Sequence, residues 1–505
     1  MIRCFLATVL YAAVLVLSLA GAAAAGERKN INALTADELE GLRRGVATMK
    51  ARDTAARNTS SWRRSWLFWA NLHGHFGSDC DGPVTGDGMS GVTTWEAGNN
   101  AERRTWCTCQ HHNAGFLPWH RIAVYHFEKV LQQAAGMPAL SLPYWDYSAD
   151  PALPAAFRDP TYVNAEGQTV ANPLYVANRN AAINAGTGGI SSSARSADNA
   201  MATSSYNTFR NRLESTPHGS VHCALSVSGC PSGYMGSVSA AALDPIFWLH
   251  HANIDRLYDC WTRSGTNTRL PTGSILNVSY SFPSATGQVV SMRVRDGLTP
   301  TQLGYNYTTA SYCSGVIAEA TSPGPLTAPT MVAGGFEGAT GMISPELERA
   351  AEAGATLWLA QNRPRATLPT EAQSRRGRPS LRLENVVADS MDPGMYEVYM
   401  VAPDGRRAFL GNMTFFAEKG DTSGAPAGHA GHATAGGEGQ TFDYDLSGPA
   451  RELGLRPGSE FEIAFVPTTG VEPLPGASAR AGQAATAVER RGASPRIGRV
   501  RVQVE

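Results

Sequence analysis

The spacing of hydrophobic and polar residues divides the chain into a helical first half and a strand-rich last third. Apolar residues recur at helical spacing in four runs, 33–53, 61–73, 116–133 and 246–262. Near the start of the first run, Thr35 is followed three residues later by Glu38, which predicts that Thr35 is the N-cap of a helix with a capping box. Because long stretches of weak periodicity separate the runs, we expect a mainly α, four-helix-bundle domain with long loops. The core of such a bundle is a place where facing side chains build metal sites.

From residue 380 the apolar residues alternate with a period of two, which predicts β-strands. The expected strands cover 380–387, 396–401, 409–416, 461–466 and 500–504. Short strands at this spacing favour a small β-sandwich. Residues 421–439 are rich in Gly, Ala, Ser and His and are expected to form a flexible insert.

The segment between these two parts changes composition, with Pro, Gly and Ala over 321–335, one expected helix over 345–362 and a polar stretch over 363–379. We interpret it as a linker. The expected organisation is a signal peptide at 1–25, the helical domain at 26–325, the linker region at 326–379 and the C-terminal β-sandwich domain at 380–505.

The N-terminal residues are typical of a secretory signal peptide. Arg3 precedes an apolar run over 5–20, and small residues follow to Ala25. The run is short for a membrane-spanning helix. We therefore expect a secreted or periplasmic protein that has no membrane contact after cleavage and folds where disulfides persist.

The amino-acid composition indicates which classes of binding partner to expect. Hydrophobic residues make up 43% of the chain, charged residues 17%, and the net charge is −1, so we expect a globular protein that does not bind nucleic acid. The pattern gives no indication of an oligomeric state. Cys4 leaves with the signal peptide, and the seven cysteines that remain are an odd number. One thiol therefore does something other than pair within the chain.

Ten of the twelve histidines lie between His73 and His251, in the helical part. Nine of them form two groups, each with a helix in which a Phe precedes a His by four residues and shares its face. His218 and His222 are also four apart and project from one face if that segment is helical. The first group is His73, His75, His111, His112 and His120, and the second is His218, His222, His250 and His251. Two similar groups predict two metal ions.

The residue types point to copper. Imidazole ligands suit Cu, Zn, Fe and Ni, and the candidate shells contain no carboxylate, which argues against a dimetal hydrolase. A zinc protease would need Glu after its first His, and Gly219 follows His218 here. Two coppers with imidazole ligands can give O2 two electrons together. A protein that binds zinc through the same histidines is the alternative.

Three motifs resemble a known family. The runs FLPWHR at 116–121 and DPIFWLHH at 244–251, with LPYWD at 142–146 between them, resemble the copper signatures of the tyrosinase, catechol oxidase and molluscan haemocyanin superfamily. The resemblance covers roughly residues 60–265. It implies that His73, His111 and His120 hold one copper ion, and that His218, His222 and His251 hold the other. His75 is an alternative to His73, while His112 and His250 are expected to be neighbours of ligands.

The resemblance also gives the odd thiol a role. Cys109 stands two residues before His111, an arrangement similar to fungal tyrosinases and molluscan haemocyanins, in which such a cysteine forms a thioether with the ligand. In the alternative, Cys109 joins a disulfide and Cys107 is free. Phe247 is expected beside His251.

Asp255 lies one turn after the ligand His251. Three roles are open for its carboxylate: it orients ring nitrogens, pairs with Arg121 or Arg256, or makes a salt bridge on the helix surface.

In the family, such sites use O2 to oxidise phenols to quinones, and three residues bear on the substrate. Glu214 resembles a carboxylate that holds a water proposed to deprotonate monophenols, although an ordinary helix-end Glu is the alternative. Gly219 stands at a position where, in the family, an Asn is associated with monophenol hydroxylation. Because this chain lacks the Asn, Gly219 favours o-diphenols as substrates. Val238 stands where the family places a gate, and its small side chain predicts an open entrance. Whether monophenols are also substrates stays open.

Residues 396–400 and 409–415 resemble, more weakly, the C-terminal domain of plant polyphenol oxidases, which covers the active site until proteolysis. We therefore expect a processing linker at 363–379, which contains Arg375 and Arg376. His429 and His432 are expected to be solvated, with copper delivery as the alternative. A haemocyanin-like oxygen carrier and an oxidase of other phenols such as o-aminophenols are the competing functions, although a single copper module argues against the carrier.

Overall fold

The computed structural model describes residues 26–73, 105–106, 108–230, 232–238, 240–264, 269–307, 364–375, 377–387, 394–416, 440–475 and 496–504. The signal peptide, the helix expected at 345–362 and the insert at 421–439 lie outside these ranges. So do His75, Cys107, Arg376, His429 and His432.

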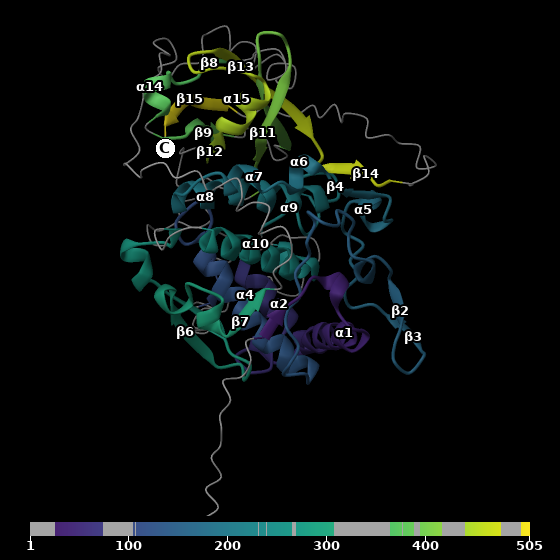
Figure 1. Cartoon of the computed structure of the whole chain (residues 1–505). Coiled ribbons are helices and arrows are strands. Elements are labelled where there is room, and N and C mark those ends of the chain that lie inside the picture. The colour runs from purple at the N-terminus through teal and green to yellow at the C-terminus, as the bar shows by residue number, and fades with distance from the viewer. Residues whose placement is uncertain are drawn as a thin grey trace, which may run out of the picture.

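Four helical segments lie where the apolar spacing predicts them, in the lower part of Figure 1. They are α1 (Ala36–Ala51), α2 (Trp66–His73), α4 (Phe116–Ala135) and α10 (Ile246–Arg263). The predicted capping box starts α1, because Thr35 Oγ1 accepts from the Glu38 amide at 3.2 Å and Glu38 Oε2 from the Thr35 amide at 2.8 Å. Their arrangement as a four-helix bundle stays a prediction.

The sequence pattern missed two helices, α8 (Tyr206–Leu213) and α9 (Ser220–Leu225), which a π-helical turn, η5 (Glu214–Gly219), joins. Shorter elements complete this part: α5 (Ala181–Asn184), α6 (Ser192–Arg195), α7 (Asp198–Met201), and strands β1 (Gly26–Arg28), β2 (Thr161–Val163), β3 (Thr169–Ala171), β4 (Gly188–Ile190), β5 (Ser279–Pro283), β6 (Val289–Arg293) and β7 (Tyr305–Tyr307).

The C-terminal part contains two sheets, with strand orders β11-β10-β13-β8 and β12-β9-β15. Buried side chains from both sheets, among them Leu383, Val398 and Ile463, form one hydrophobic cluster. The strands are β8 (Arg365–Thr367), β9 (Pro379–Val387), β10 (Met395–Val401), β11 (Arg407–Thr414), β12 (Gln440–Asp445), β13 (Glu460–Thr468) and β15 (Arg496–Val504), and the helices are α14 (Glu371–Ser374) and α15 (Ser447–Glu452).

One expected boundary is wrong. Residues 363–379 were expected to belong to the linker, but β8 pairs antiparallel with β13, with Thr367 opposite Glu460. Three residues are too short a run to show a period of two, so the strand leaves no signal in the pattern. The C-terminal unit therefore begins by Arg365, and a cut after Arg375 would remove a strand from its sheet.

The C-terminal part lies against α7, α8 and α9, as Figure 1 shows. Strand β14 (Val471–Pro473) pairs antiparallel with β4 of the helical part. Arg212 on α8 forms a buried ion pair with Asp443 on β12, and Arg212 Nε donates at 2.8 Å. Backbone pairing and a buried charge pair thus join two parts that are far apart in the sequence.

Among the residues that the structure describes, no helix combines the length and apolar character needed to cross a membrane.

Candidate metal centre

Two clusters of buried histidines lie in the helical part. The first contains His73 at the end of α2, His111 in the loop before α4, His120 on α4 and the thiol of Cys109, with one ligand atom from each within 4.8 Å of the others. The second contains His218 on η5, His222 on α9, and His250 and His251 on α10, within the same limit. The structure therefore gathers all six histidines that the resemblance assigns to copper.

The two clusters face each other. The rings of His120 and His251 stack with centroids 4.5 Å apart, and Nε2 of His222 lies 3.4 Å from Nε2 of His251. The ring of Phe247 covers His251 at 4.2 Å and His73 at 4.7 Å. The two clusters are therefore in direct contact, with the ring of Phe247 packed against a histidine of each.

Backbone carbonyls fix the orientation of four of these rings. Nδ1 lies within hydrogen-bond distance of one carbonyl oxygen in each of four pairs: His73 with Val238 at 2.9 Å, His120 with Phe116 at 2.8 Å, His218 with Glu214 at 3.0 Å and His222 with Met235 at 2.8 Å. Because a carbonyl oxygen can only accept, Nδ1 must carry the proton. Nε2 of each ring is therefore the unprotonated nitrogen and can act as a metal ligand, the arrangement typical of metal-binding histidines.

Burial keeps the imidazoles of the second cluster neutral. It lowers the pKa of His218 to about 4 and the pKa values of His222 and His251 well below the ordinary value. Metal ions bind the neutral form of imidazole, so the cluster is in its ligand form at neutral pH. An all-imidazole set of this kind fits copper.

His250 lies closer to the site than expected. Its ring centroid is 4.9 Å from that of His222 and 5.7 Å from that of His218. A nitrogen of His250 falls within the second cluster, so its assignment as a neighbour of the ligands rests on the resemblance alone.

The structure describes four of the seven cysteines that follow the signal peptide. Cys109 is a free, buried thiol, and its sulfur lies 3.6 Å from Nε2 of His120. Cys223 and Cys230 form a disulfide, and Cys260 is also disulfide-bonded. Cys109 is therefore placed for a bond to an imidazole, while its thioether to His111 stays a prediction.

Glu214 lies at the edge of the first cluster with both carboxylate oxygens engaged. Oε1 accepts from the His112 amide at 2.7 Å, and Oε2 accepts from Nη1 of Arg210 at 3.0 Å. His112 has a left-handed backbone, with φ of 56°. The His112 amide and Arg210 thus hold the carboxylate of Glu214 in place beside the histidines. A glutamate that only ended a helix would not need both contacts.

Strand β11 brings the C-terminal part to the site. Phe416, two residues after the strand, stacks on His222 with ring centroids 3.8 Å apart, and also contacts His218 edge-on at 5.5 Å. A Cβ added at Gly219 would lie 2.5 Å from Oγ1 of Thr414, so only glycine fits under the end of this strand.

The cavity that remains is small. Its volume is about 20 Å³, which is close to the space that one water molecule needs. It is lined by residues of both parts, among them His111, Glu214, His218, Thr414, Phe416 and Gln440. The space beside Phe416 therefore holds little more than one water molecule among the described residues.

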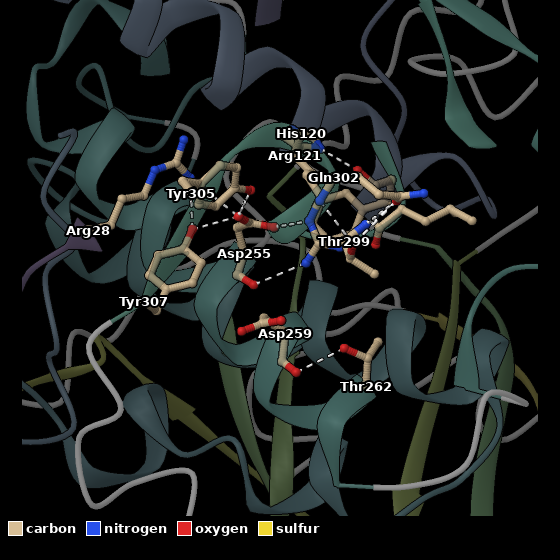
Figure 2. Close-up of polar contacts among 12 residues, drawn as sticks. Arg28, His120, Arg121, Asp255, Asp259, Thr262, Thr299, Gln302, Tyr305 and Tyr307 are labelled. Atoms are coloured by element: carbon tan, nitrogen blue, oxygen red, sulfur yellow. Dashed lines mark hydrogen bonds and ion pairs between the residues drawn. The ribbon is translucent and has the colours of Figure 1, made fainter. Parts of the chain in front are cut away.

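Asp255 forms the centre of a buried ion-pair network next to α4 and α10, the helices that carry His120 and His251 (Figure 2). Its carboxylate accepts from Nε of Arg121 and from the hydroxyls of Tyr305 and Tyr307, each at 2.5 Å, and Arg28 lies 3.4 Å away. Burial alone would raise the pKa of Asp255, but the charges of Arg121 and Arg28 hold it below its ordinary value.

Of the roles open for Asp255, pairing with Arg121 is the one observed. Arg256 pairs instead with Asp146, at 3.1 Å. The network joins α4 and α10, which carry His120 and His251, to β1 and β7.

Several parts of the site left no signal in the sequence analysis. The carbonyls of Met235 and Val238 are backbone groups, so no residue type marks them. The sequence analysis considered Val238 only for its small side chain. Phe416 and Arg28 come from segments distant from the histidines.

Comparisons with known proteins agree with this geometry. The common central domain of tyrosinase matches residues 63–199 and 159–264. A tyrosinase of Hahella is 31% identical over 326 residues, which cover 56% of this chain and 63% of that protein. The chloroplastic polyphenol oxidase of Malus domestica is 30% identical over 227 residues, 39% of this chain and 38% of that protein.

Solved structures show the same fold over nearly the whole length. Latent apple tyrosinase is 18% identical with a TM-score of 0.59, over 95% of this chain and 97% of that one. Latent aurone synthase, a polyphenol oxidase, is 16% identical with a TM-score of 0.59, over 96% and 90%. These structures show a likeness of fold. The chain spans less than two thirds of the length of the two sequence relatives above.

Proposed function

We propose that this chain is a dicopper phenol oxidase that uses O2 to oxidise o-diphenols to o-quinones. One observation supports this most directly: six buried imidazoles lie in two facing clusters, and four of them have Nδ1 within hydrogen-bond distance of a backbone carbonyl. We propose that His73, His111 and His120 hold one copper ion, and that His218, His222 and His251 hold the other.

Bound copper would supply the electrons that O2 accepts and the Lewis acidity that polarises the phenol oxygen. The residues of this chain orient the copper ligands and exclude water from them. The carbonyl contacts fix the imidazole orientations, and Phe247 and Phe116 exclude water from their faces. The Asp255 network keeps α4 and α10, and with them the two clusters, at a fixed separation.

The residues at the cavity favour o-diphenols as the main substrate. An o-diphenol brings both hydroxyls and needs no hydroxylation, while a monophenol must first lose its proton and gain an oxygen. Gly219 offers no side-chain amide beside His218, and Arg210 neutralises part of the charge of Glu214. We propose monophenols as poorer substrates for this reason.

The C-terminal part supports a latent state of the enzyme. Phe416 fills the space over His222, and the cavity left beside it is too small for a phenol. We propose that the C-terminal domain shields the site until the chain is cut between Tyr307 and Pro364, which would leave β8 in its sheet.

The apolar N-terminal segment and the Cys223–Cys230 disulfide support a secreted or periplasmic location, because disulfides persist in oxidising compartments.

Copper loading tests the proposal. The purified chain should bind two copper ions and gain a strong near-ultraviolet band with O2, and the chain cut between Tyr307 and Pro364 should lose that band when catechol is added. Zinc binding with no band would exclude the oxidase. A stable band that catechol leaves unchanged after the C-terminal domain is removed would favour an oxygen carrier. Tyrosine in place of catechol measures the monophenol activity.

A further inference from the structure

One loop contacts a histidine of each cluster. The carbonyl of Met235 accepts from Nδ1 of His222 at 2.8 Å, and the carbonyl of Val238 accepts from Nδ1 of His73 at 2.9 Å. His222 belongs to the second cluster and His73, which is 165 residues from Val238, to the first. Two carbonyls only three residues apart therefore orient one ligand of each proposed copper ion.

A disulfide closes the start of this loop. Cys223 follows His222 directly and is bonded to Cys230, seven residues on, and both are buried. Between Leu225, where α9 ends, and Ala241, where a short 3-10 helix begins, the described residues form turns rather than a helix or strand. The cross-link thus constrains a segment that the hydrogen bonding of a helix or strand does not hold in place.

The rest of the loop packs tightly on itself. A Cβ added at Gly236 would lie 2.4 Å from the carbonyl oxygen of Ser232 and 2.6 Å from Cβ of Ser226. Because Gly236 is next to Met235, any widening of the loop would move the Met235 carbonyl. Ser228 and Ser232 hydrogen-bond at the exposed turn, away from these carbonyls.

We infer that the Cys223–Cys230 disulfide is a positioning element for both metal sites, acting through the carbonyls of Met235 and Val238. This rests on the proposed dicopper function. Without the cross-link the loop gains conformational freedom, and the imidazoles of His222 and His73 lose the partners that fix their tautomers. Loss of such partners weakens metal binding by about 10- to 100-fold.

The test compares the full chain with the double variant Cys223→Ser, Cys230→Ser and with Ser228→Ala as a matched loop control. Each is loaded with Cu(II) and dialysed against increasing chelator, and copper per chain and the Cu(II) EPR signal are measured. Coupled copper pairs are EPR-silent, while a lone Cu(II) gives a signal. The double variant should lose both ions together at about tenfold less chelator or lower, and Ser228→Ala should match the unmodified chain.

A second variant keeps the disulfide and covers the case in which the first does not fold. Gly236→Ala forces the loop to shift, so it should also release both ions at lower chelator. Retention of both ions by either folded variant would overturn the inference. So would loss of one ion that leaves one EPR-visible Cu(II) per chain. If the unmodified chain does not bind two copper ions, the proposed function fails instead.

Discussion

The ring of Phe416 stacks on the imidazole of His222, with centroids 3.8 Å apart and planes 13° from parallel. Phe416 belongs to the hydrophobic core of the helical part, whereas its neighbour Phe415 belongs to that of the C-terminal sheets. The chain therefore crosses from one core to the other between two adjacent residues. The C-terminal part thus places an aromatic ring on a histidine of the second cluster, where we propose that the phenol binds.

Phe416→Ala should raise the activity of the uncut enzyme. Removing a buried Phe ring costs roughly 3 kcal/mol, so the closed arrangement should weaken and catechol oxidation should rise by at least about tenfold. The measurement is the rate of O2 uptake before any proteolysis.

Tyr399→Ala is the control for this variant, because Tyr399 lies on β10 and packs on Phe409. It should leave the rate of the uncut enzyme unchanged. Equal rates for Phe416→Ala and the unmodified chain would show that Phe416 does not block the site.

Gly219→Ala should also activate the uncut enzyme, because the new Cβ would lie 2.5 Å from Oγ1 of Thr414. Overpacking of this kind costs about 1–3 kcal/mol, enough to raise O2 uptake by roughly tenfold. Adding Thr414→Ala removes the clashing hydroxyl and should restore the low rate. If the double variant is as active as Gly219→Ala, the contact is not the cause.

Much of the fold could be predicted from the sequence. The long helices α4 and α10 repeat their apolar spacing over several turns, and β9, β10, β11 and β13 alternate clearly. α8 and α9 were missed because they are short and interrupted by the turn that contains Pro217. β8 was missed because three residues cannot show a period.

The ligand residues could be predicted, but what orients them could not. The histidines belong to recognisable motifs, and the structure gathers all six. Their partners are backbone carbonyls, which every residue carries, so nothing in the side chains of Met235 or Val238 marks them. Phe416 lies 194 positions after His222, and only the docking of the two parts brings them together.

Asp255→Asn should destabilise the protein strongly. The change removes a buried charge that faces Arg121 and Arg28, and breaking such a pair costs about 3–5 kcal/mol. Tyr305→Phe, which removes the hydroxyl bond from Tyr305 to Asp255, should cost about 1 kcal/mol. Chemical denaturation of both metal-free variants measures the difference, and similar losses would contradict the central role of the carboxylate.

His126 should make the metal-free protein sensitive to acid. Burial lowers its pKa from 6.5 to about 4, so the unfolded chain takes up a proton that the folded chain does not as the pH falls from 6.5 to 4. His126 does not change the free energy of unfolding above pH 6.5, and it lowers this free energy by about 3 kcal/mol below pH 4.

His126→Phe keeps a ring against Phe282, on which His126 stacks at 5.5 Å. The unfolding free energy of this variant should fall less steeply between pH 6.5 and 4 than that of the unmodified chain. An identical pH profile would mean that His126 is protonated in the folded state.

The most direct test of the account is O2 consumption with catechol by the copper-loaded chain, before and after cleavage at a protease site inserted between Tyr307 and Pro364. Slow uptake by the intact chain and rapid uptake with quinone formation after cleavage would support a latent phenol oxidase. Reversible O2 binding without catechol consumption in both forms would contradict it.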